Sequence, residues 1–524
     1  MNRSCDVAVV GGGPAGLAAT LQLARQRRSV IVIDDDTPRN APAAHMHGYL
    51  GHESASPQEL RARGRVEVRS YGGEVLSGRV TGATRDDAGR IALSLTGGHT
   101  LRARRVLLAT GLRDELPDIE GVAAAWGGGV LHCPFCHGFE VRDTRLVQIV
   151  THSFGLHPTA LLRHLTTDLT VVLHGGVEID AAALAPYESA GVPVLRADVR
   201  RVLTRPADSG PADVEGVELA DGTVVPADAV MVGPRFAMRA EVAAGLGLTP
   251  VAHVSGAGDL VEVDERGETA VRGLYAAGNV TDPSLQVMPA AAHGSRVAAM
   301  IAFDLAGEDL AAGTRGGGAR QDWEERYAGE EPMWSGNPNG TLVAEVADLP
   351  PGRALDVGAG EGGDAIWLAE RGWQVTATDI SEHALARVGA GAAQRGVSVE
   401  LLRADANDPV PYPEGAYDLV SLQYGSFPRT PDDRGLRHVL AAVAPGGTLL
   451  VVAHDLAPMR EPIDVDTQTR MWDPEAFVGV AEFAAALADD PAWRIDVHGT
   501  RPRPPGAASS HHVDDVVLRA VRLT

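Results

Sequence analysis

Lysine is absent from this 524-residue sequence, so all 46 of its basic residues are arginine. The absence excludes chemistry that begins with a lysine Schiff base and excludes a phosphate-binding P-loop, because both need a lysine amine. Apolar runs are also short, since none approaches the ~18 residues that a membrane-spanning helix requires. The amino-terminal segment has none of the regions of a signal peptide. We therefore expect a cytoplasmic protein that does not cross a membrane.

Basic residues are outnumbered by acidic ones, and the formal net charge is −23 at pH 7. Nucleic-acid surfaces depend on clustered basic side chains that contact phosphates, so this balance argues against nucleic acid as a partner. The chain also exceeds the ~250–300 residues at which single hydrophobic cores stop growing. The sequence thus predicts at least two globular domains that act on small molecules or protein thiols.

Cysteine is scarce, and three residues are too few for a disulfide framework. Two of them, Cys133 and Cys136, form a C-x-x-C pair, which indicates either redox chemistry or half of a zinc site. A zinc site would need a second such pair or paired histidines, and the chain has no further cysteine pair. We therefore interpret the pair as redox-active and expect no metal.

A nucleotide-binding pattern opens the chain. Residues 6–10 read as a buried strand and residues 17–25 as a helix, and between them lie Gly11, Gly12, Gly13, Pro14, Ala15 and Gly16. This spacing allows a tight turn at Gly11, approach of a pyrophosphate at Gly13 and close helix packing at Gly16. A second strand, residues 30–33, ends in Asp34, near the expected position of a ribose-binding carboxylate.

Two later segments indicate which nucleotide binds. Residues 106–111, which end in Thr110 and Gly111, resemble the strand-and-ATG segment of flavoproteins with two dinucleotide-binding domains. Residues 273–279 resemble their late FAD-contacting strand and end in Gly278 and Asn279, with Asn279 in place of the usual Asp. These resemblances imply FAD. Gln286 and Val287 then lead into an alanine-rich helix whose positive end would lie under the flavin pyrimidine.

The order of these motifs around the cysteine pair resembles the low-molecular-weight thioredoxin reductase family over the first ~310 residues. The resemblance implies an α/β FAD-binding domain, residues 1–112 and 250–310, with an inserted NAD(P)-like domain, residues 113–249, that carries the C-x-x-C. Relatives of this type are commonly homodimers, and we expect a homodimer here.

The same resemblance assigns roles to the redox residues. Cys136 would face the flavin and form the thiol–flavin contact, while Cys133 would exchange with the substrate sulfur. His137 stands where the family has an acidic Asp. Because histidine titrates near neutrality, His137 would protonate a departing thiolate or take a proton from an entering thiol.

The inserted domain departs from the family where NADPH would bind. The strand of residues 146–150 is followed by residues 151–156, T-H-S-F-G-L, in place of a G-x-G-x-x-A turn. The next strand ends in His174 where an arginine pair is expected. Side chains at the turn and the missing arginine clamp argue against NADPH as a cofactor.

The closest functional analogy is therefore to the thioredoxin-reductase-like dithiol oxidases of disulfide-containing natural products. These enzymes pass electrons from a substrate dithiol through C-x-x-C to flavin and on to oxygen. Two alternatives remain: an NADPH-dependent thioredoxin-disulfide reductase, and a flavin redox sensor that regulates the second half of the chain. The expected partner of the first half is a small-molecule dithiol or a thioredoxin-like protein.

Residues 311–321 are rich in glycine and alanine and read as a linker to a domain over residues 322–524. This domain carries a strand with an internal aspartate that runs into a glycine-rich turn, and two further aspartates at the ends of the next two strands; the residues are Asp356, Gly358, Gly360, Gly362, Asp379, Asp405 and Ala406. The series resembles Rossmann-like class I methyltransferases, whereas another NAD-type Rossmann unit is the alternative.

The methyltransferase resemblance implies a binding mode for S-adenosylmethionine. Its methionine portion would lie on the glycine turn, its ribose on Asp379 and its adenine amino group at Asp405. Residues 323–327 and 334–339 resemble the amino-terminal lid of tellurite-resistance and thiopurine-type methyltransferases, which often covers soft acceptors. We expect a small, sulfur-containing methyl acceptor, oriented by Gln423, Tyr424 and His454 unless these residues are structural.

Overall fold

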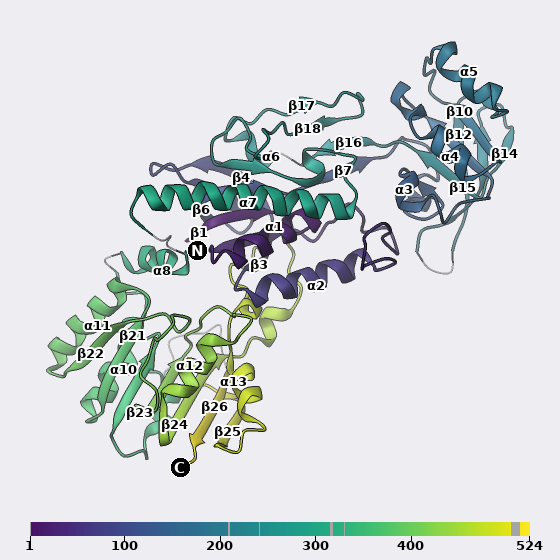
Figure 1. Cartoon of the computed structure of the whole chain (residues 1–524). Coiled ribbons are helices and arrows are strands. Elements are labelled where there is room, and N and C mark those ends of the chain that lie inside the picture. The colour runs from purple at the N-terminus through teal and green to yellow at the C-terminus, as the bar shows by residue number, and fades with distance from the viewer. Residues whose placement is uncertain (1, 208–209, 240, 315–317, 330, 505–513) are drawn as a thin grey trace.

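The computed structural model describes residues 2–524 except 208–209, 240, 315–317, 330 and 505–513. The described residues form three α/β units, which we call the first unit, the inserted unit and the C-terminal unit (Figure 1). The first unit lies between the other two, so the inserted unit and the C-terminal unit occupy opposite ends of the molecule (Figure 1).

The first unit is built on a seven-stranded sheet. Its order is β3-β2-β1-β6-β5-β4, with β19 paired to β6. The strands are β1 (Asn2–Val10), β2 (Val30–Asp34), β3 (Glu74–Ser77), β4 (Val80–Arg85), β5 (Ile91–Leu95), β6 (His99–Leu108) and β19 (Leu274–Ala276). Its helices are α1 (Pro14–Arg25), α2 (Pro57–Ser70), α6 (Glu241–Ala244) and α7 (Val287–Ala311), and a short hairpin is made by β17 (Val251–Ala252) and β18 (Asp259–Leu260).

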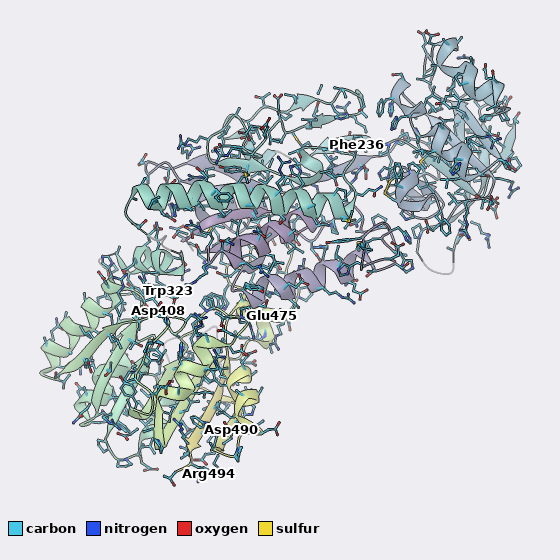
Figure 2. The ribbon with its side chains drawn as sticks, viewed as in Figure 1. Phe236, Trp323, Asp408, Glu475, Asp490 and Arg494 are labelled. Atoms are coloured by element: carbon cyan, nitrogen blue, oxygen red, sulfur yellow. A yellow bond between two sulfur atoms is a disulfide. The ribbon has the colours of Figure 1, made fainter. Side chains whose placement is uncertain are left out.

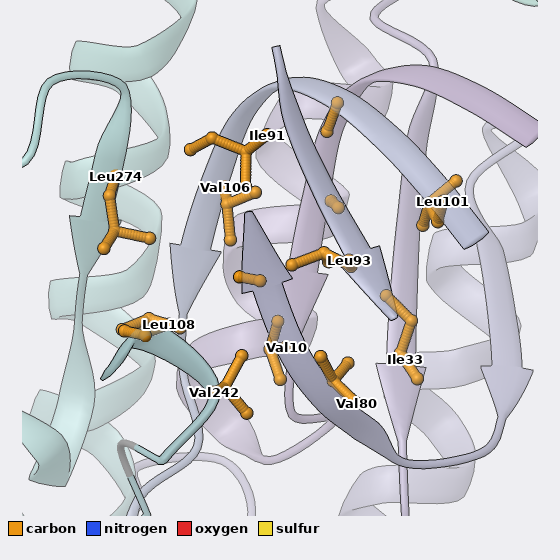
Figure 3. Close-up of a cluster of buried hydrophobic side chains, with 14 of the residues drawn as sticks. Val10, Ile33, Val80, Ile91, Leu93, Leu101, Val106, Leu108, Val242 and Leu274 are labelled. Carbon is orange, nitrogen blue, oxygen red and sulfur yellow. The ribbon is translucent and has the colours of Figure 1, made fainter. Parts of the chain in front are cut away.

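Both faces of this sheet are buried, which explains why the second half of β1, residues 7–10, is entirely apolar. Val7 and Val9 pack with α1 and α7 on one face. Val10 points to the other face, where Figure 3 shows it near Val80 and Val242. Because Val242 belongs to this core, residues after β16 return to the first unit, and the expected end of the inserted domain at residue 249 lies too far along the chain.

The inserted unit is joined to the first by two antiparallel strands, β7 (Leu112–Glu115) and β16 (Arg235–Met238). Its parallel sheet has the order β11-β10-β9-β15-β8. These strands are β8 (Val130–Leu131), β9 (Leu146–Val150), β10 (Leu169–Leu173), β11 (Val194–Arg196) and β15 (Ala229–Val232). An antiparallel sheet of β12 (Val199–Arg205), β13 (Asp213–Leu219) and β14 (Val224–Pro226), and helices α3 (Pro134–His137), α4 (Thr159–Leu165) and α5 (Ala181–Ser189), complete it.

The C-terminal unit has a seven-stranded sheet of order β22-β21-β20-β23-β24-β26-β25, in which β26 pairs antiparallel with both β24 and β25. The strands are β20 (Arg353–Val357), β21 (Gln374–Asp379), β22 (Val399–Arg403), β23 (Tyr417–Gln423), β24 (Val443–His454), β25 (Trp493–Pro502) and β26 (Asp514–Arg522). The helices are α8 (Gly318–Tyr327), α9 (Gly340–Val346), α10 (Gly363–Glu370), α11 (Glu382–Arg395), α12 (Arg434–Ala442) and α13 (Val480–Leu487).

The expected linker is shorter than predicted. Helix α7 runs to Ala311, and α8 already begins at Gly318. Residues 318–321 are therefore helical, while residues 315–317 lie outside the described residues.

The C-terminal unit docks on the first unit through the loops that follow its parallel strands. After β24, Met471 enters the hydrophobic core of the first unit beside Leu76 and Val80. Nearby, Asp473 accepts a hydrogen bond from Arg69 Nε at 2.8 Å. Figure 2 places Glu475, from the same segment, on the side of the unit that faces the first unit. The carboxyl edge of the C-terminal sheet thus faces the first unit.

Among the described residues, no helix combines the length and the hydropathy needed to cross a bilayer.

Candidate active sites

The glycine turn after β1 is tight and packs closely against α1. Gly11 has φ +105°, where only glycine is readily tolerated. A Cβ on Gly16 would lie less than 3.0 Å from the Gly11 carbonyl oxygen, so the helix packs directly on the turn. A Cβ on Gly13 would meet no atom within 4 Å. The space beside Gly13, at the amino terminus of α1, fits a pyrophosphate.

Asp34 lies at the end of β2 with its carboxylate against Gly12. It accepts hydrogen bonds from Arg61 at 2.6 Å and from Arg65 at 2.7 Å. Burial raises the pKa of Asp34, but the two arginines outweigh burial and hold the pKa below its ordinary value. Asp34 is therefore a carboxylate at neutral pH, as a ribose ligand must be. These two arginines could not be predicted from the sequence, because no pattern in residues 57–70 indicates that they lie beside the end of β2.

One cavity joins the first and inserted units. It is lined by nearly all the predicted flavin residues together with the redox residues: Gly11, Gly13, Pro14, Ala15, Asp34, Thr110, Gly111, Gly278, Asn279, Gln286, Val287, Cys133, Cys136 and His137. Gly16 packs behind the turn instead. The pair of sulfurs and the nucleotide turn thus belong to the same site.

Two polar side chains in this cavity suit a flavin nucleotide. The Thr110 hydroxyl is buried and finds no hydrogen-bond partner among the described residues. The Asn279 amide nitrogen donates to the carbonyls of Asp282, Pro283 and Leu285, at 2.8 to 3.3 Å. The Asn279 carbonyl oxygen would then be the atom that accepts a hydrogen bond from a ribityl hydroxyl. The residues present therefore fit FAD.

Cys133 and Cys136 form a disulfide around the short helix α3. His137, the last residue of α3, has a pKa below its ordinary value, chiefly because it is partly buried. His137 is thus neutral near pH 7 and able to accept a proton. Both sulfurs line the cavity, so which of them meets the flavin stays a prediction.

The sequence did not single out His47 as a second histidine of the redox site. Its ring lies 6.4 Å from that of His137, centroid to centroid, and both line the cavity. His47 Nδ1 lies 2.7 Å from a Glu53 carboxylate oxygen. The loop that carries His45, His47 and His52 follows β2, and its distance in sequence from the cysteines gave no signal of the contact.

The inserted unit has a different turn where NADPH binds in thioredoxin reductases. A short helical turn, Ser153–Leu156, follows β9, and the Phe154 ring stacks on His157 at 5.1 Å. His174, at the end of β10, accepts a hydrogen bond from the Val199 amide at 2.9 Å. A hollow beside this turn is lined by two acidic residues, Glu178 and Asp180.

The glycine turn of the C-terminal unit needs its glycines. Gly358, Gly360 and Gly362 have φ values of +71°, +56° and +87°. The Gly360 amide donates to Asp379 at 3.0 Å, and the Ser381 amide donates to the other Asp379 oxygen at 2.9 Å. Asp379, whose pKa is raised chiefly by burial, is thereby fixed beside the turn.

The remaining predicted ligand residues differ in position. Asp356 is fully buried, accepts the Ala365 amide and so holds the start of α10; burial raises its pKa well above the ordinary value. Asp405 accepts the Asn407 amide at 2.9 Å at the end of β22. Ala406 packs in the core of the unit. Asp379 and Asp405 thus lie at the carboxyl edge of the sheet, whereas Asp356 lies within β20 and holds the start of α10.

The predicted lid closes over this turn. Trp334 Nε1 donates to the Tyr327 hydroxyl at 3.1 Å. A Cβ on Gly360 would lie 3.1 Å from that hydroxyl, so lid and turn are in contact. Glu361, in the turn, accepts the amides of Met333 and Trp334 at 3.0 and 2.9 Å.

The predicted acceptor residues lie beside the turn. Gly425 is 3.8 Å from the Cβ position of Gly358, and Tyr424 precedes it with φ +53°. The Tyr424 hydroxyl donates to the buried Asp515 at 2.7 Å, and its ring stacks on His454 at 4.3 Å. The buried amide of Gln423 donates to the Ser421 hydroxyl at 3.0 Å. Tyr424 and His454 thus form a rigid wall of the site.

Comparison with known proteins agrees with both halves. A family model described as pyridine nucleotide-disulphide oxidoreductase matches residues 5–295, and one described as methyltransferase domain matches residues 354–447. Thioredoxin reductase sirT of Leptosphaeria maculans is 31% identical over 320 residues, which are 59% of this chain and 96% of that protein. Thioredoxin reductase tcpT of Claviceps purpurea is 31% identical over 309 residues, which are 57% and 92%.

Solved structures give the same fold for the first half. The structure of HlmI is 39% identical, with a TM-score of 0.55, and covers 59% of this chain and 95% of its own. An oxidoreductase from Agrobacterium tumefaciens is 31% identical, with a TM-score of 0.53, and covers 58% and 98%.

The fold and the two sites define a bifunctional enzyme, an oxidoreductase joined to a methyltransferase, with FAD and S-adenosylmethionine as the implied cofactors. The chain belongs to the pyridine nucleotide-disulphide oxidoreductase family.

Proposed function

We propose that the first enzyme oxidises a small-molecule dithiol to a disulfide and delivers the electrons to oxygen. The observation that carries the proposal is that the cysteine pair and the flavin residues line one cavity, while the inserted unit lacks the features that bind NADPH. We therefore expect the electron pair to enter from a thiol substrate rather than from a pyridine nucleotide.

Three features of the inserted unit support this direction. The helical turn at residues 153–156 puts side chains where a pyrophosphate would approach. His174 is engaged with the Val199 amide and supplies no guanidinium for a 2′-phosphate. Glu178 and Asp180 would repel a phosphate nearby.

The residues of the chain can carry out the exchange. A substrate thiol gives its proton to the neutral His137, and the thiolate attacks Cys133 Sγ, so that the Cys133–Cys136 bond breaks and Cys136 leaves as a thiolate. The second substrate thiolate then attacks the mixed disulfide, which releases the oxidised substrate and leaves both cysteines reduced. FAD, held by the glycine turn and Asp34, would supply the two-electron acceptor that returns the cysteines to the disulfide and the route of this electron pair to oxygen. With the two thiol protons leaving in the peroxide, a dithiol and O₂ would become a disulfide and H₂O₂.

Exposed apolar side chains lie close in sequence to the redox residues and support an apolar substrate. Phe135, between the two cysteines, and Phe139, two residues after His137, are each 66% exposed. Leu50, in the loop that contributes His47, is 91% exposed. Exposed aromatic and aliphatic side chains around a polar centre are typical of a surface that binds an apolar ligand.

Anaerobic titration of the FAD-loaded protein tests the direction of electron flow. Dithiothreitol should bleach the flavin and NADPH should not, and readmitted oxygen should restore the colour with formation of H₂O₂. Rapid bleaching by NADPH would instead establish the reductase alternative. Omission of the dithiol gives the control for photoreduction.

For the second enzyme, we propose methyl transfer from S-adenosylmethionine to a thiolate that is also a substrate or product of the first. The closed lid and the rigid wall of Tyr424 and His454 support in-line transfer in a site shielded from water. Ser4, which contacts α8, is seven residue steps along β1 from Gly11 at the redox cavity, a span of about 23 Å at ~3.3 Å per residue. A shared metabolite would therefore travel through solvent.

Mass spectrometry of a dithiol incubated with S-adenosylmethionine tests the link between the two enzymes. It should detect S-methylation only of thiols that the flavin enzyme also oxidises, and methylation of none of them would refute the link.

A further inference from the structure

We propose that the first enzyme is a structural part of the S-adenosylmethionine site: Arg3 in β1 and Asp322 in α8 are positioning residues for the methyltransferase lid. The inference rests on the proposed function of the second enzyme. It concerns a contact between the two enzymes that neither enzyme alone would contain.

A buried ion network joins α8 to the sheet of the first unit. Arg3 makes two hydrogen bonds to Glu74, at 2.6 and 2.7 Å, and its Nε lies 3.6 Å from Asp322. Asp322 also accepts the Ser4 amide at 2.7 Å and pairs with Arg326 at 2.8 Å. The side chains of Arg3 and Asp322 are 6% and 7% exposed. A network of this kind tolerates little movement, because the loss of one partner leaves a buried charge unpaired.

The opposite face of α8 holds the methyltransferase site. Residues 324 and 327 lie about 200° and 140° around the helix from residue 322, at ~100° per residue. Glu324 accepts the Ser381 hydroxyl at 2.8 Å and the Glu382 amide at 2.7 Å, next to the ribose carboxylate Asp379. Tyr327 contacts the Gly360 turn, as described above. Helix α8 thus connects β1 to both the expected ribose end and the expected methionine end of the site.

A second contact supports the same edge from the first unit. Pro428, after β23, packs against Gly72: a Cβ added to Gly72 would lie 2.8 Å from the Cβ of Pro428. The Pro428 carbonyl accepts a hydrogen bond from the Asn407 side chain at 2.9 Å. The Asn407 amide in turn donates to Asp405 at 2.9 Å. The loop that is expected to hold the adenine therefore also rests on the first enzyme.

The position of the lid should set cofactor affinity more than the rate of the chemical step. When α8 loses its anchor, the lid spends part of its time away from the turn, and the apparent dissociation constant rises by the inverse of the closed fraction. Once S-adenosylmethionine saturates the enzyme, the lid is closed again. A KM effect with a small kcat effect is thus the signature of positioning.

The test uses the full-length, FAD-loaded protein with the variant Asp322→Ala. We expect the dissociation constant for S-adenosylmethionine, measured by calorimetry, and its KM to rise about tenfold or more, while kcat changes less than about twofold. Flavin reduction by dithiothreitol should stay at the wild-type rate, since the redox cavity lies at the other end of β1. Arg395→Gln, which breaks an exposed pair with Glu370 in the same unit, is the matched control and should change nothing.

A milder variant decides the question if Asp322→Ala unfolds the C-terminal unit in thermal melting. Arg90→Gln breaks the 2.5 Å pair between the first unit and Glu325 in α8, where both side chains reach solvent. It should raise the dissociation constant about twofold to threefold. Wild-type affinity in a folded Asp322→Ala, or in Arg90→Gln if only that variant folds, would overturn the inference. Absence of S-adenosylmethionine binding by the wild-type protein would instead overturn the proposed methyltransferase function.

Discussion

Two single-methyl substitutions in the first glycine turn separate cofactor binding from folding. Gly13 has φ −77°, which alanine adopts freely, and a methyl group there would meet no protein atom within 4 Å. Gly13→Ala should therefore leave the apoprotein as stable as the wild type to within about 1 kcal/mol, since the loss at the helix cap is offset by the smaller entropy of the unfolded chain.

The same methyl group should strongly impair FAD binding. It occupies the space that the pyrophosphate needs at the start of α1, and overpacking of this kind costs about 1–3 kcal/mol. The dissociation constant for FAD should rise roughly 5-fold to 150-fold, because each 1.4 kcal/mol is a factor of ten. Titration of apoprotein with FAD, followed by quenching of flavin fluorescence, measures the effect.

Gly16→Ala is the contrasting variant. Its methyl group would press on the Gly11 carbonyl oxygen inside 3.0 Å, so both stability and FAD affinity should fall. If Gly13→Ala binds FAD as tightly as the wild type, or if it destabilises the apoprotein as much as Gly16→Ala does, the assignment of this turn to the pyrophosphate is wrong.

Three further predictions follow from single contacts. Because the pKa of His137 lies below 6.5, its neutral, proton-accepting form should persist as the pH falls below that value. For a dithiol whose own ionisation does not change over this range, the oxidation rate should therefore stay constant past pH 6.5 and decline only at lower pH. His137→Gln should abolish that decline in a pH–rate profile. Burial raises the pKa of Asp364, in the first turn of α10, to about 6, above its ordinary 3.8. The protonated group therefore contributes stability that is fully present below pH 3.8 and is lost as the pH rises through about 6. Asp364→Asn should remove this fall, on the order of 3 kcal/mol in the free energy of unfolding, as measured by denaturant unfolding at a series of pH values. Met471→Ala should destabilise the contact between the two enzymes by about 2–5 kcal/mol, which calorimetry should detect as a lower temperature of the first unfolding transition. A single transition at an unchanged temperature would show that the loop does not anchor the units.

The local motifs could be predicted from the sequence because their geometry is set within a few residues. The turns at Gly11 and Gly358 need positive φ angles, and the spacing of their glycines states this directly. The positions of the carboxylates Asp34 and Asp379 could also be predicted, since each residue ends the strand that follows such a turn and its helix. The order of the motifs then determined the fold.

Contacts between distant segments could not be predicted in the same way. Arg61 reaches Asp34 from a helix whose sequence shows only an ordinary charged surface. Met471 reads as part of a surface loop, and its burial depends on how the two enzymes dock. The segment around Val242 looked like part of the inserted domain because only its packing partners, not its sequence, mark it as core of the first unit. The role of α8 was likewise hidden, because its anchor, Arg3, lies more than 300 residues away.

The most direct test of the redox assignment is anaerobic stopped-flow mixing of the FAD-loaded protein with excess dithiothreitol, for the wild type and for the separate variants Cys133→Ser and Cys136→Ser. We predict that the wild-type flavin bleaches in a fast phase and that this phase disappears in both variants, with FAD still bound. Bleaching at the wild-type rate in both variants would contradict electron transfer through the cysteine pair.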